Sequence, residues 1–419
     1  MKPSGTSNKL KHLAVSTTQG LAGDLLRESQ YVFLYRTKLP ECAVSLTMPI
    51  RAQSYAGNVL PGVFRQNLPE GYLDLWIRHH FGKTMKMDDM AMLGITGASM
   101  IGRVTFSPPA IENHPVADGE SLGEILAWKG TEDLFEYLSN KYAATSGVSG
   151  IQPKVLLRNK DADSDVVEKS TIKAKSVIVK SSGEDYPDLA ENEFLCMSIA
   201  KKAGMEVPDF WLSENRRLFV VNRFDLRDGE FLGFEDMTAL MNRGADEKYS
   251  SSYENVAKAV SLFSSPQFRN HSLRELFRSV VLSILVRNGD AHLKNFGMLY
   301  THPGSNDCRL SPLYDVVNTT CYIPKDTLAL KLNTTKAWPA RNDLALFGAK
   351  HCLVDRPGHI IEEIAAAAMD FMPDDPSSRI WAAMRPVIAQ SCFTLTGKGY
   401  VSGASLSEQS SASPPKVSG

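Results

Sequence analysis

The strongest constraint on the fold of this chain is a change in the spacing of its apolar residues near position 240. Before that point the apolar residues fall in short runs of strand length, as in Val177-Ile-Val179 and Leu218-Phe-Val-Val221. After it they recur at helical intervals over residues 253–263, 273–286 and 360–371. The sequence therefore predicts an α+β fold in which a strand-rich lobe precedes a helical lobe.

Changes in composition divide the chain into five expected segments. Residues 1–24 are polar and predict a flexible amino-terminal arm, and residues 25–110 predict a small β-containing domain. Residues 125–240 predict the strand-rich lobe, and residues 241–395 predict the helical lobe. The Ser-rich segment 401–419 has no aromatic residue and predicts a disordered tail.

Local patterns predict particular elements in the first half of the chain. Strands are expected over residues 31–35 and 43–47, which are separated by a Leu-Pro-Glu turn. Helices are expected over residues 72–81, 134–142 and 188–203 because their apolar residues follow helical spacing.

Composition argues against several classes of protein. Lys+Arg 46 against Asp+Glu 47 leaves a formal net charge of -1, which does not indicate a nucleic-acid or membrane-surface binder. The six cysteines include no Cys-x-x-Cys pair, so neither a zinc ribbon nor a disulfide framework is indicated. The first twenty residues lack an apolar core segment, and no run of about 18 apolar residues occurs. We therefore expect a cytoplasmic protein with reduced thiols and no membrane association.

The segment Arg287-Asn-Gly-Asp-Ala-His-Leu-Lys-Asn-Phe-Gly297 carries the strongest chemical signal in the chain. Asp290 and Asn295 are five residues apart, as are the base and the metal-binding amide of a protein-kinase catalytic loop. Asp315 stands where a second metal-binding carboxylate is expected, although an aspartate that caps a helix is the alternative. The sequence thus predicts ATP chemistry, with Asp290 receiving the proton of the acceptor hydroxyl and Asn295 and Asp315 holding Mg²⁺.

Further side chains supply the remaining parts of a phosphoryl-transfer site. Lys180 ends the apolar run Val177-Ile-Val179 and would contact ATP phosphates, although a solvated lysine at a strand end is the alternative. Glu193, in the helix that follows, would orient Lys180 through an ion pair. Lys294 is expected to neutralise charge on the transferred phosphoryl group. His292 is expected to stiffen the loop beside the nucleotide by hydrogen bonding.

The segment Ser146-Gly-Val-Ser-Gly-Ile-Gln-Pro-Lys154 is a glycine-containing turn that precedes an expected strand. Such a turn lets backbone N–H groups approach phosphates. It follows neither the Walker pattern nor the Gly-x-Gly-x-x-Gly pattern, so on its own it is a loop with a lysine.

These pieces, in this order, resemble the HipA family of serine/threonine-kinase toxins, whose fold is similar to that of phosphoinositide-kinase-like enzymes. The resemblance extends from about residue 30 to about residue 390. It is carried jointly by Ser149-Gly-Ile-Gln-Pro-Lys154, Val177-Ile-Val-Lys180, Glu191-Asn-Glu-Phe-Leu-Cys196, Asn222-Arg-Phe-Asp225, Glu235-Asp-Met237, Asn288-Gly-Asp-Ala-His-Leu-Lys-Asn295 and Pro312-Leu-Tyr-Asp315.

The resemblance implies a bilobal protein-kinase-like fold preceded by the HipA amino-terminal subdomain over residues 25–110. It also implies roles in ATP and Mg²⁺ binding or in catalysis for some of the matching positions. By this likeness Lys154 and Lys180 would contact the ATP phosphates, Glu235, Asp236 and Met237 would form the adenine hinge, Asp290 would be the catalytic aspartate, and Asn295 and Asp315 would hold Mg²⁺.

The chain departs from the family in its regulatory loop. That loop commonly reads Ser-x-(Ser or Ala)-Gly-x-Gln-x-Lys, and autophosphorylation of its first serine abolishes ATP binding. Alignment on Lys154 places Gly147 at the first position and Ser149 at the second. The phosphate would therefore fall on Ser149, with Ser146 as the second choice, where its negative charge would compete with ATP.

Family members phosphorylate proteins, in known cases aminoacyl-tRNA synthetases, and so arrest growth. A partner with a helix-turn-helix domain inhibits them, and DNA is bound mainly through that antitoxin. The resemblance thus implies a growth-arresting protein serine/threonine kinase. Two alternatives stay open: a catalytically weak, nucleotide-binding corepressor scaffold for the antitoxin, and a kinase of small molecules or lipids.

Overall fold

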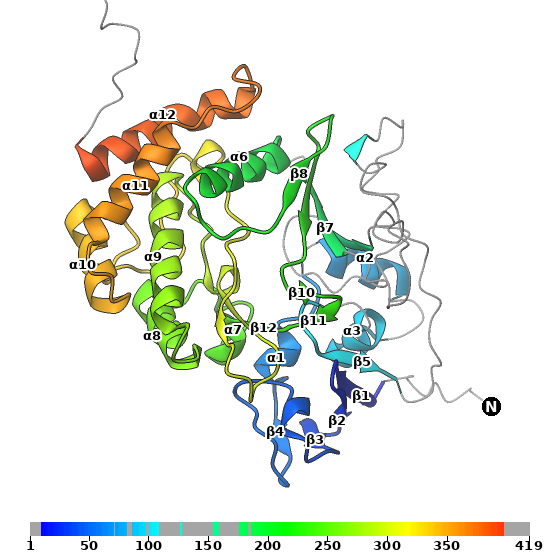
Figure 1. Ribbon diagram of the computed structural model, residues 1–419. Helices are drawn as coiled ribbons and strands as arrows, with labels where there is room; N and C mark the ends of the chain where they lie inside the picture. The colour runs from blue at the N-terminus through cyan, green and yellow to red at the C-terminus, as the bar shows by residue number, and fades with distance from the viewer. Residues whose placement is uncertain are drawn as a thin grey trace, which may run out of the picture.

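The computed structural model describes residues 10–70, 72–81, 86–97, 100–108, 126–127, 154–158, 176–182 and 186–397. Within these residues the chain forms an amino-terminal domain, a strand-rich lobe and a helical lobe (Figure 1). The α+β class and the order of the two lobes are as expected from the sequence. The expected helix over 134–142 and the expected tail over 401–419 lie outside the described residues.

The amino-terminal domain is built on an antiparallel sheet with strand order β4-β3-β2-β1-β5. Its strands are β1 (His12–Thr17), β2 (Gly20–Arg27), β3 (Tyr31–Tyr35), β4 (Tyr55–Gly57) and β5 (Thr105–Ser107). The shorter elements around the sheet are η1 (Pro40–Cys42), α1 (Gly62–Arg65), α2 (Tyr72–Phe81) and α3 (Asp89–Thr96). The core of this domain contains Leu13, Phe33, Phe64 and Leu93, all of them fully buried.

The expected flexible arm over residues 1–24 is wrong from His12 onward, because β1 and most of β2 lie within it. Leu13 and Val15 alternate with less buried neighbours along β1, as a half-buried strand requires. His12 also contacts Asp24 on β2 at 2.7 Å. Many residues in this stretch are small or polar, so the alternation of buried and less buried side chains is weak in the sequence. It becomes clear only from the pairing of β1 with β2.

The expected strand over 31–35 and the expected helix over 72–81 are confirmed as β3 and α2. The expected strand over 43–47 is wrong, since only an isolated bridge between Ser45 and Met48 forms there. The reason is that Ser45 Oγ and the Leu46 N–H both donate hydrogen bonds to a buried carboxylate from another part of the chain.

The strand-rich lobe contains an antiparallel sheet with strand order β6-β7-β9-β8. Its strands are β6 (Lys154–Arg158), β7 (Ser176–Ser181), β8 (Phe210–Leu212) and β9 (Leu218–Asn222). Helix α6 (Leu189–Lys202) packs against β7, β8 and β9 and buries Leu195 and Ile199. The chain leaves this helix through Gly204, whose φ of 67° lies in the left-handed region that favours glycine.

A small sheet with strand order β12-β13-β14 packs against the helical lobe. Its strands are β12 (Gly233–Asp236), β13 (Gly297–Tyr300) and β14 (Arg309–Leu310), and the hairpin of β10 (Leu226–Arg227) and β11 (Glu230–Phe231) precedes them. Asp236 pairs with Gly297, so the loop that contains Asp290 is held beside the end of β12.

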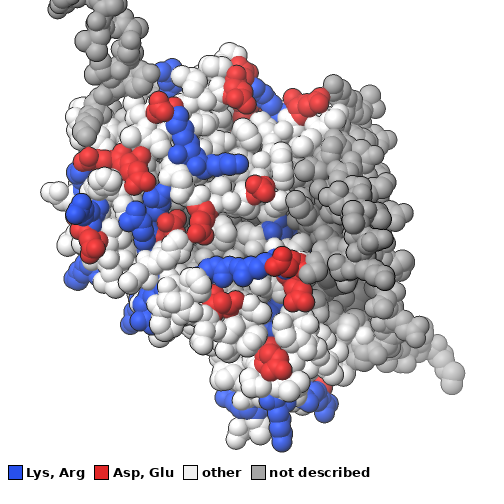
Figure 2. Space-filling view, in the orientation of Figure 1, with Lys and Arg blue, Asp and Glu red and all other residues white. Residues whose placement is uncertain are grey.

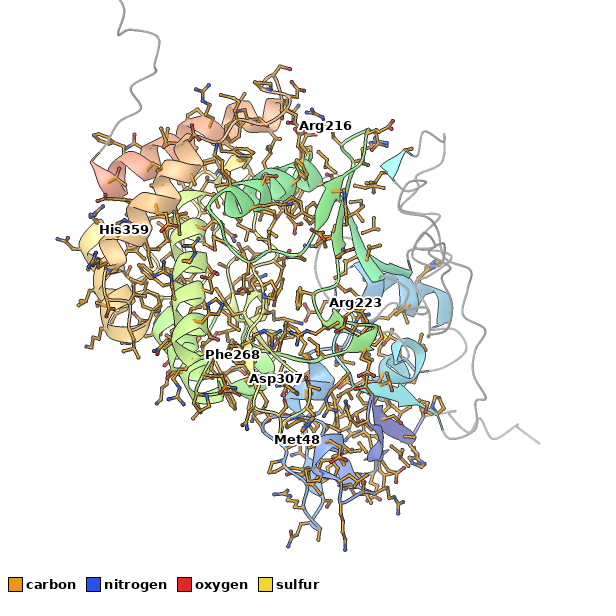
Figure 3. All side chains as sticks on the ribbon, viewed as in Figure 1. Met48, Arg216, Arg223, Phe268, Asp307 and His359 are labelled. Carbon is orange, nitrogen blue, oxygen red and sulfur yellow. The ribbon has the colours of Figure 1, made fainter. Side chains whose placement is uncertain are left out.

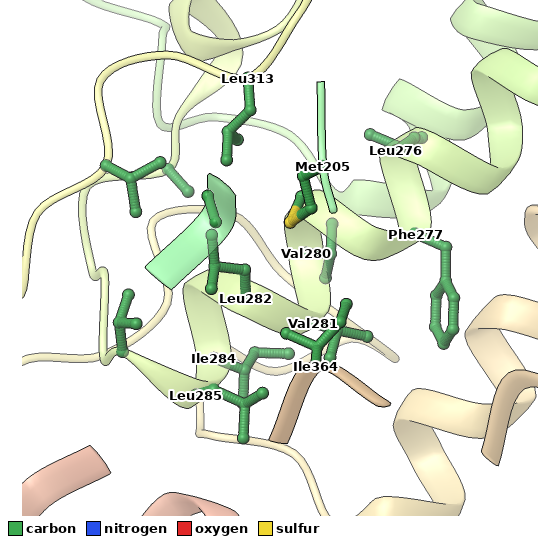
Figure 4. Close-up of a cluster of buried hydrophobic side chains, with 14 of the residues drawn as sticks. Met205, Leu276, Phe277, Val280, Val281, Leu282, Ile284, Leu285, Leu313 and Ile364 are labelled. Carbon is green, nitrogen blue, oxygen red and sulfur yellow. The ribbon is translucent and has the colours of Figure 1, made fainter. Parts of the chain in front are cut away.

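The helical lobe packs around α9 (Arg269–Leu285) (Figures 1 and 4). Every side chain of α9 from Leu276 to Leu285 is buried. The other elements of this lobe are α7 (Met237–Leu240), α8 (Tyr253–Phe263), η4 (Leu293–Asn295), η5 (Thr319–Cys321), α10 (Arg341–His351), α11 (Pro357–Met369) and α12 (Arg379–Thr396). The lobe shares one continuous apolar core with α6, which fixes the strand-rich lobe against it.

Charges of both signs are interspersed over the face shown in Figure 2. That distribution agrees with the formal net charge of -1. None of the described helices has the combination of length and apolar character needed to cross a membrane.

Candidate active site

A cavity of about 840 Å³ is lined by residues of all three parts of the molecule. The amino-terminal domain contributes Gln66 and Glu70, the strand-rich lobe contributes Lys180, and the helical lobe contributes Asp290 and Asp315. A volume of this size is within the usual range for pockets that bind cofactor-sized ligands. Most of the side chains predicted from the sequence to form a site meet here.

Lys180 is the centre of a buried ion-pair network on β7. Its Nζ lies 2.5 Å from Glu193 Oε1 and 2.7 Å from Asp315 Oδ1. Lys180 is 5% exposed and Glu193 is 1% exposed. Burial alone would lower the pKa of Lys180, but the charges of Asp315 and Glu193 outweigh it and raise that pKa above its usual value. The lysine is therefore a fixed cation, which excludes the alternative of a solvated strand end.

Asn295 and Asp315 lie together at the cavity. The Asn295 amide nitrogen donates a hydrogen bond of 2.8 Å to Asp315 Oδ2, and its amide oxygen accepts one of 2.9 Å from the His292 N–H. The φ of Asp315 is 61°, in the left-handed region that non-glycine residues seldom adopt. An amide oxygen has a second lone pair, and carboxylate and amide oxygens are the donors that Mg²⁺ prefers. Asn295 and Asp315 are therefore the two residues here that could hold a magnesium ion.

Asp290 faces the same cavity from the loop that follows α9. The Tyr249 hydroxyl donates a hydrogen bond of 2.7 Å to Asp290 Oδ1. The Asp290 N–H donates one of 3.0 Å to the side-chain oxygen of Asn288, which is itself buried. The aspartate is thus presented on a loop that hydrogen bonds hold at both its backbone and its side chain.

The residue of this loop that lies in the left-handed region is Arg287, with a φ of 55°, and not Gly289. Glycine is required at 289 for a different reason. A Cβ there would overlap the Asp326 carboxylate and lie 2.7 Å from the Thr327 carbonyl oxygen. The catalytic-type loop is therefore packed directly against the segment after η5.

Gly289→Ala is expected to lower the free energy of unfolding by about 1–3 kcal/mol, because backbone atoms must move to admit the methyl group. Chemical denaturation measures this change. Gly304→Ala is the control: its Cβ would meet only the His302 ring, at 3.5 Å, and a change below about 0.5 kcal/mol is expected. Equal effects of the two substitutions would contradict the packing argument.

His292 is a buried member of the same loop and contacts the Tyr249 ring edge to face, with centroids 5.1 Å apart. Burial, and after it the nearby positive charge of Lys248, lowers the pKa of His292 to about 3. The imidazole is therefore neutral at physiological pH. The backbone N–H of His292 donates a hydrogen bond to the Asn295 amide oxygen and so stiffens the loop.

This pKa shift predicts a pH dependence of stability. An unfolded histidine titrates near 6.5, so between pH 3 and pH 6.5 the unfolded chain binds more protons than the folded chain. The contribution of His292 to the free energy of unfolding is then fully present above pH 6.5. Below pH 6.5 the free energy of unfolding falls by about 1.4 kcal/mol for each pH unit. Between pH 8 and pH 5, the unfolding free energy should fall about 2 kcal/mol more in the wild type than in His292→Asn.

The measurement is chemical denaturation at the two pH values. His359, labelled in Figure 3, is an exposed histidine on α11 and supplies the matched control. His359→Asn should keep the wild-type pH dependence. If His292→Asn kept it as well, the buried neutral imidazole would not be its source.

Lys294 is held by the amino-terminal domain, which the sequence did not predict. Its Nζ lies 2.7 Å from Glu70 Oε1, and Lys248 Nζ lies 4.0 Å from Glu70 Oε2. In its expected role, Lys294 would therefore neutralise a phosphoryl group while it is also paired with a carboxylate of the amino-terminal domain. Glu70 carries no motif that marks it, because its partners are more than 170 residues away along the chain.

The three residues of the expected adenine hinge, Glu235, Asp236 and Met237, lie differently with respect to the cavity. Asp236 lines the cavity, but Glu235 and Met237 are not among the described lining residues. The Glu235 carboxylate instead accepts hydrogen bonds from Ser45, Leu46 and the Tyr300 hydroxyl, at 2.6–2.7 Å. Burial raises its pKa despite these donors. Glu235 is therefore part of the contact between the amino-terminal domain and β12.

The segment from Asn222 to Asp225 also lines the cavity. Phe224 packs against Tyr314, with ring centroids 5.0 Å apart. Arg223, labelled in Figure 3, is buried, pairs with Asp225 at 2.5 Å and donates to the Met100 carbonyl oxygen at 2.7 Å. In the sequence this segment is recognised only as a family motif, without a role; its position directly after the apolar strand β9 could have indicated one.

Several predicted site residues lie wholly or partly outside the described structure. Ser146 and Ser149 are not described. The backbone of Lys154 is described and pairs with Lys180 across the β6–β7 ladder, but its side chain is not.

The fold and the cavity together define a bilobal, kinase-like protein with an additional amino-terminal domain. Comparison with known proteins shows that the chain belongs to the HipA family. Residues 146–372 match the HipA-like C-terminal domain, and residues 13–107 match the HipA N-terminal domain. The family membership expected from the motifs is therefore confirmed.

Two of the relatives that are similar in sequence carry kinase names. One is "Putative kinase Y4dM" of Sinorhizobium fredii, 27% identical over 314 residues that cover 70% of this chain and 71% of that protein. The other is a "Putative kinase" of Haemophilus influenzae, 36% identical over 193 residues that cover 42% of this chain and 53% of that protein.

One of the solved structures that are similar in fold matches nearly the whole chain. It is a chain of the Shewanella oneidensis MR-1 toxin–antitoxin complex of HipA, HipB and operator DNA. The TM-score is 0.62 at 17% identity, and the match covers 92% of this chain and 96% of that chain. The bilobal kinase-like fold is confirmed by this likeness.

Proposed function

We propose that this chain is an ATP- and Mg²⁺-dependent protein serine/threonine kinase. The observation that carries the proposal is the buried network in which Lys180 bridges Glu193 and Asp315, with Asp290 and Asn295 in the same cavity. Phosphoryl transfer depends on positioning and charge neutralisation, and this network supplies both. The kinase names of the two sequence relatives agree with this assignment.

Each side chain then has a role in the transfer. Lys180, kept in place by Glu193, would bind the ATP phosphates, and Asn295 and Asp315 would hold Mg²⁺. Bound Mg²⁺ would neutralise charge on those phosphates. Asp290 would accept the proton of the acceptor hydroxyl as its oxygen bonds to the γ-phosphorus. The bond from that phosphorus to the bridging oxygen breaks, and ADP leaves.

The biological role we propose is that of a growth-arresting toxin held by a helix-turn-helix antitoxin, with DNA bound mainly through that partner. The likeness in fold to the chain of the HipA–HipB–operator DNA complex supports it. A protein target of the aminoacyl-tRNA synthetase class and autophosphorylation of Ser149, or else Ser146, belong to the same proposal. They are inferred from the family resemblance.

The test is transfer of label from γ-labelled ATP to dephosphorylated casein and to the chain itself, with and without Mg²⁺. Labelled serine or threonine that requires Mg²⁺ and is lost in Asp290→Asn supports the kinase. Nucleotide binding by the wild type without any transfer would overturn it in favour of a corepressor scaffold. Mapping of the label by mass spectrometry decides between Ser149 and Ser146.

A further inference from the structure

Tyr249 belongs to none of the sequence motifs but makes close contacts with the loop that carries Asp290. Its hydroxyl donates to Asp290 Oδ1 at 2.7 Å, and its ring meets the His292 ring with centroids 5.1 Å apart. The carbonyl oxygen of the preceding residue, Lys248, accepts a hydrogen bond of 3.1 Å from the Leu293 N–H. The backbone, the ring and the hydroxyl of this segment are thus all fixed on the same loop.

The contact lies inside the cavity, because both Tyr249 and Asp290 line it. Burial, and after it the charge of Asp290, raises the pKa of Tyr249 above its usual value. The phenol therefore keeps its proton at neutral pH and acts as a donor. A charge-assisted O–H···O⁻ bond of this kind is stronger than a bond between neutral groups.

An aspartate carboxylate needs such a contact if it is to keep one orientation. The terminal torsion of an aspartate side chain is broad and has no sharp preferred angle. A strong donor on one oxygen restricts that rotation. A carboxylate has about four acceptor positions, and the bond from Tyr249 occupies one of them.

We infer that Tyr249 is a positioning residue for phosphoryl transfer, which holds the Asp290 carboxylate at the angle needed to receive the acceptor proton. The inference rests on the proposed kinase function. It adds a group outside the motifs that identify the family. Tyr249 acts through Asp290 and has no contact of its own with the transferred phosphoryl group in this role.

The chain supplies a matched control four residues later. The Tyr253 hydroxyl also donates to the same loop, at 3.1 Å, but to the Ala291 carbonyl oxygen. Tyr253 is fully buried. Removal of its hydroxyl therefore disturbs the packing of the loop without releasing the Asp290 carboxylate.

The experiment compares Tyr249→Phe and Tyr253→Phe in the transfer of label from Mg²⁺-ATP to dephosphorylated casein. Tyr249→Phe should lower kcat by about 10- to 100-fold with an unchanged KM for ATP, because only the transfer step depends on the aim of Asp290. Tyr253→Phe should keep kcat within about threefold of the wild type, since its hydroxyl does not contact the carboxylate. Thermal unfolding of both variants shows that each is folded.

A double-variant cycle sharpens the result. Asp290→Asn already removes the proton acceptor, so the addition of Tyr249→Phe should cause almost no further loss of kcat. Full, additive losses from the two substitutions would overturn the inference. So would a loss in Tyr253→Phe equal to that in Tyr249→Phe, which would indicate a purely structural role.

One further outcome would overturn it. If mass spectrometry found phosphate on Tyr249 after incubation with ATP, the tyrosine would be an acceptor and not a positioning residue. A wild type that transfers no label would instead reject the proposed kinase function. The two failures are therefore distinguishable in the same set of reactions.

Discussion

Asp290→Asn is expected to lower kcat for transfer from ATP by about 10²- to 10⁴-fold, the range typical of a lost general base. The substitution keeps the size of the side chain and an oxygen that can accept the hydrogen bond from Tyr249. It removes the negative charge and the capacity to take up a proton. Nucleotide affinity should change little, because Lys180, Asn295 and Asp315 stay in place.

Initial rates with γ-labelled ATP and isothermal titration with a non-hydrolysable ATP analogue measure these two quantities. Asp307, labelled in Figure 3, provides the matched control, since it accepts hydrogen bonds from Thr301 and does not line the cavity described here. Asp307→Asn should leave the transfer rate within about twofold of the wild type. A rate in Asp290→Asn equal to that of the wild type would reject the role assigned to Asp290.

Lys180→Met is expected to have the largest effect on stability. It takes the ammonium group away from the buried Glu193 and from Asp315, which lie 2.5 Å and 2.7 Å from it. Removal of one partner from a buried ion pair typically costs about 3–5 kcal/mol, because the remaining charge keeps its desolvation penalty. The free energy of unfolding should fall by about that amount, and affinity for ATP should fall with it.

A second substitution tests the cause of this loss. Lys180→Met combined with Glu193→Leu should recover most of the lost stability without recovering ATP binding, because an apolar pair replaces the buried charges. Lys350→Met, on the exposed end of α10, is the control and should change stability by less than about 0.5 kcal/mol. If the double variant stayed as unstable as Lys180→Met, the buried charge of Glu193 would not be the reason.

The amino-terminal domain contributes directly to the candidate site. Glu70 pairs with Lys294 at 2.7 Å, and Gln66 hydrogen-bonds the backbone of Phe234 and Asp236 at 2.8 Å and 2.9 Å. Ser45 and Leu46 are bound by the Glu235 carboxylate. The domain that precedes the kinase-like lobes is therefore anchored on the strand and the loop that frame the cavity.

Elements with a strong periodic pattern were predictable from the sequence. The strand over 31–35 and the helices over 72–81 and 253–263 coincide with β3, α2 and α8, because local spacing of apolar residues decides which face is buried. The strands β1 and β2 were missed, since their small and polar residues give a weak local signal. Their pairing and the burial of Leu13 and Val15 make them strands.

The sequence by itself determined which residue types are available for phosphoryl transfer, because Asp290 and Asn295 lie within one short loop and share a readable spacing. It also determined the pairing of Lys180 with Glu193, since a strand and the helix after it are neighbours along the chain. Only the tertiary structure decided that Tyr249 fixes Asp290, that Glu70 holds Lys294, and that Glu235 faces the amino-terminal domain and not the cavity. These contacts join segments separated by 41, 224 and 189 positions, and no local spacing encodes a contact over such distances.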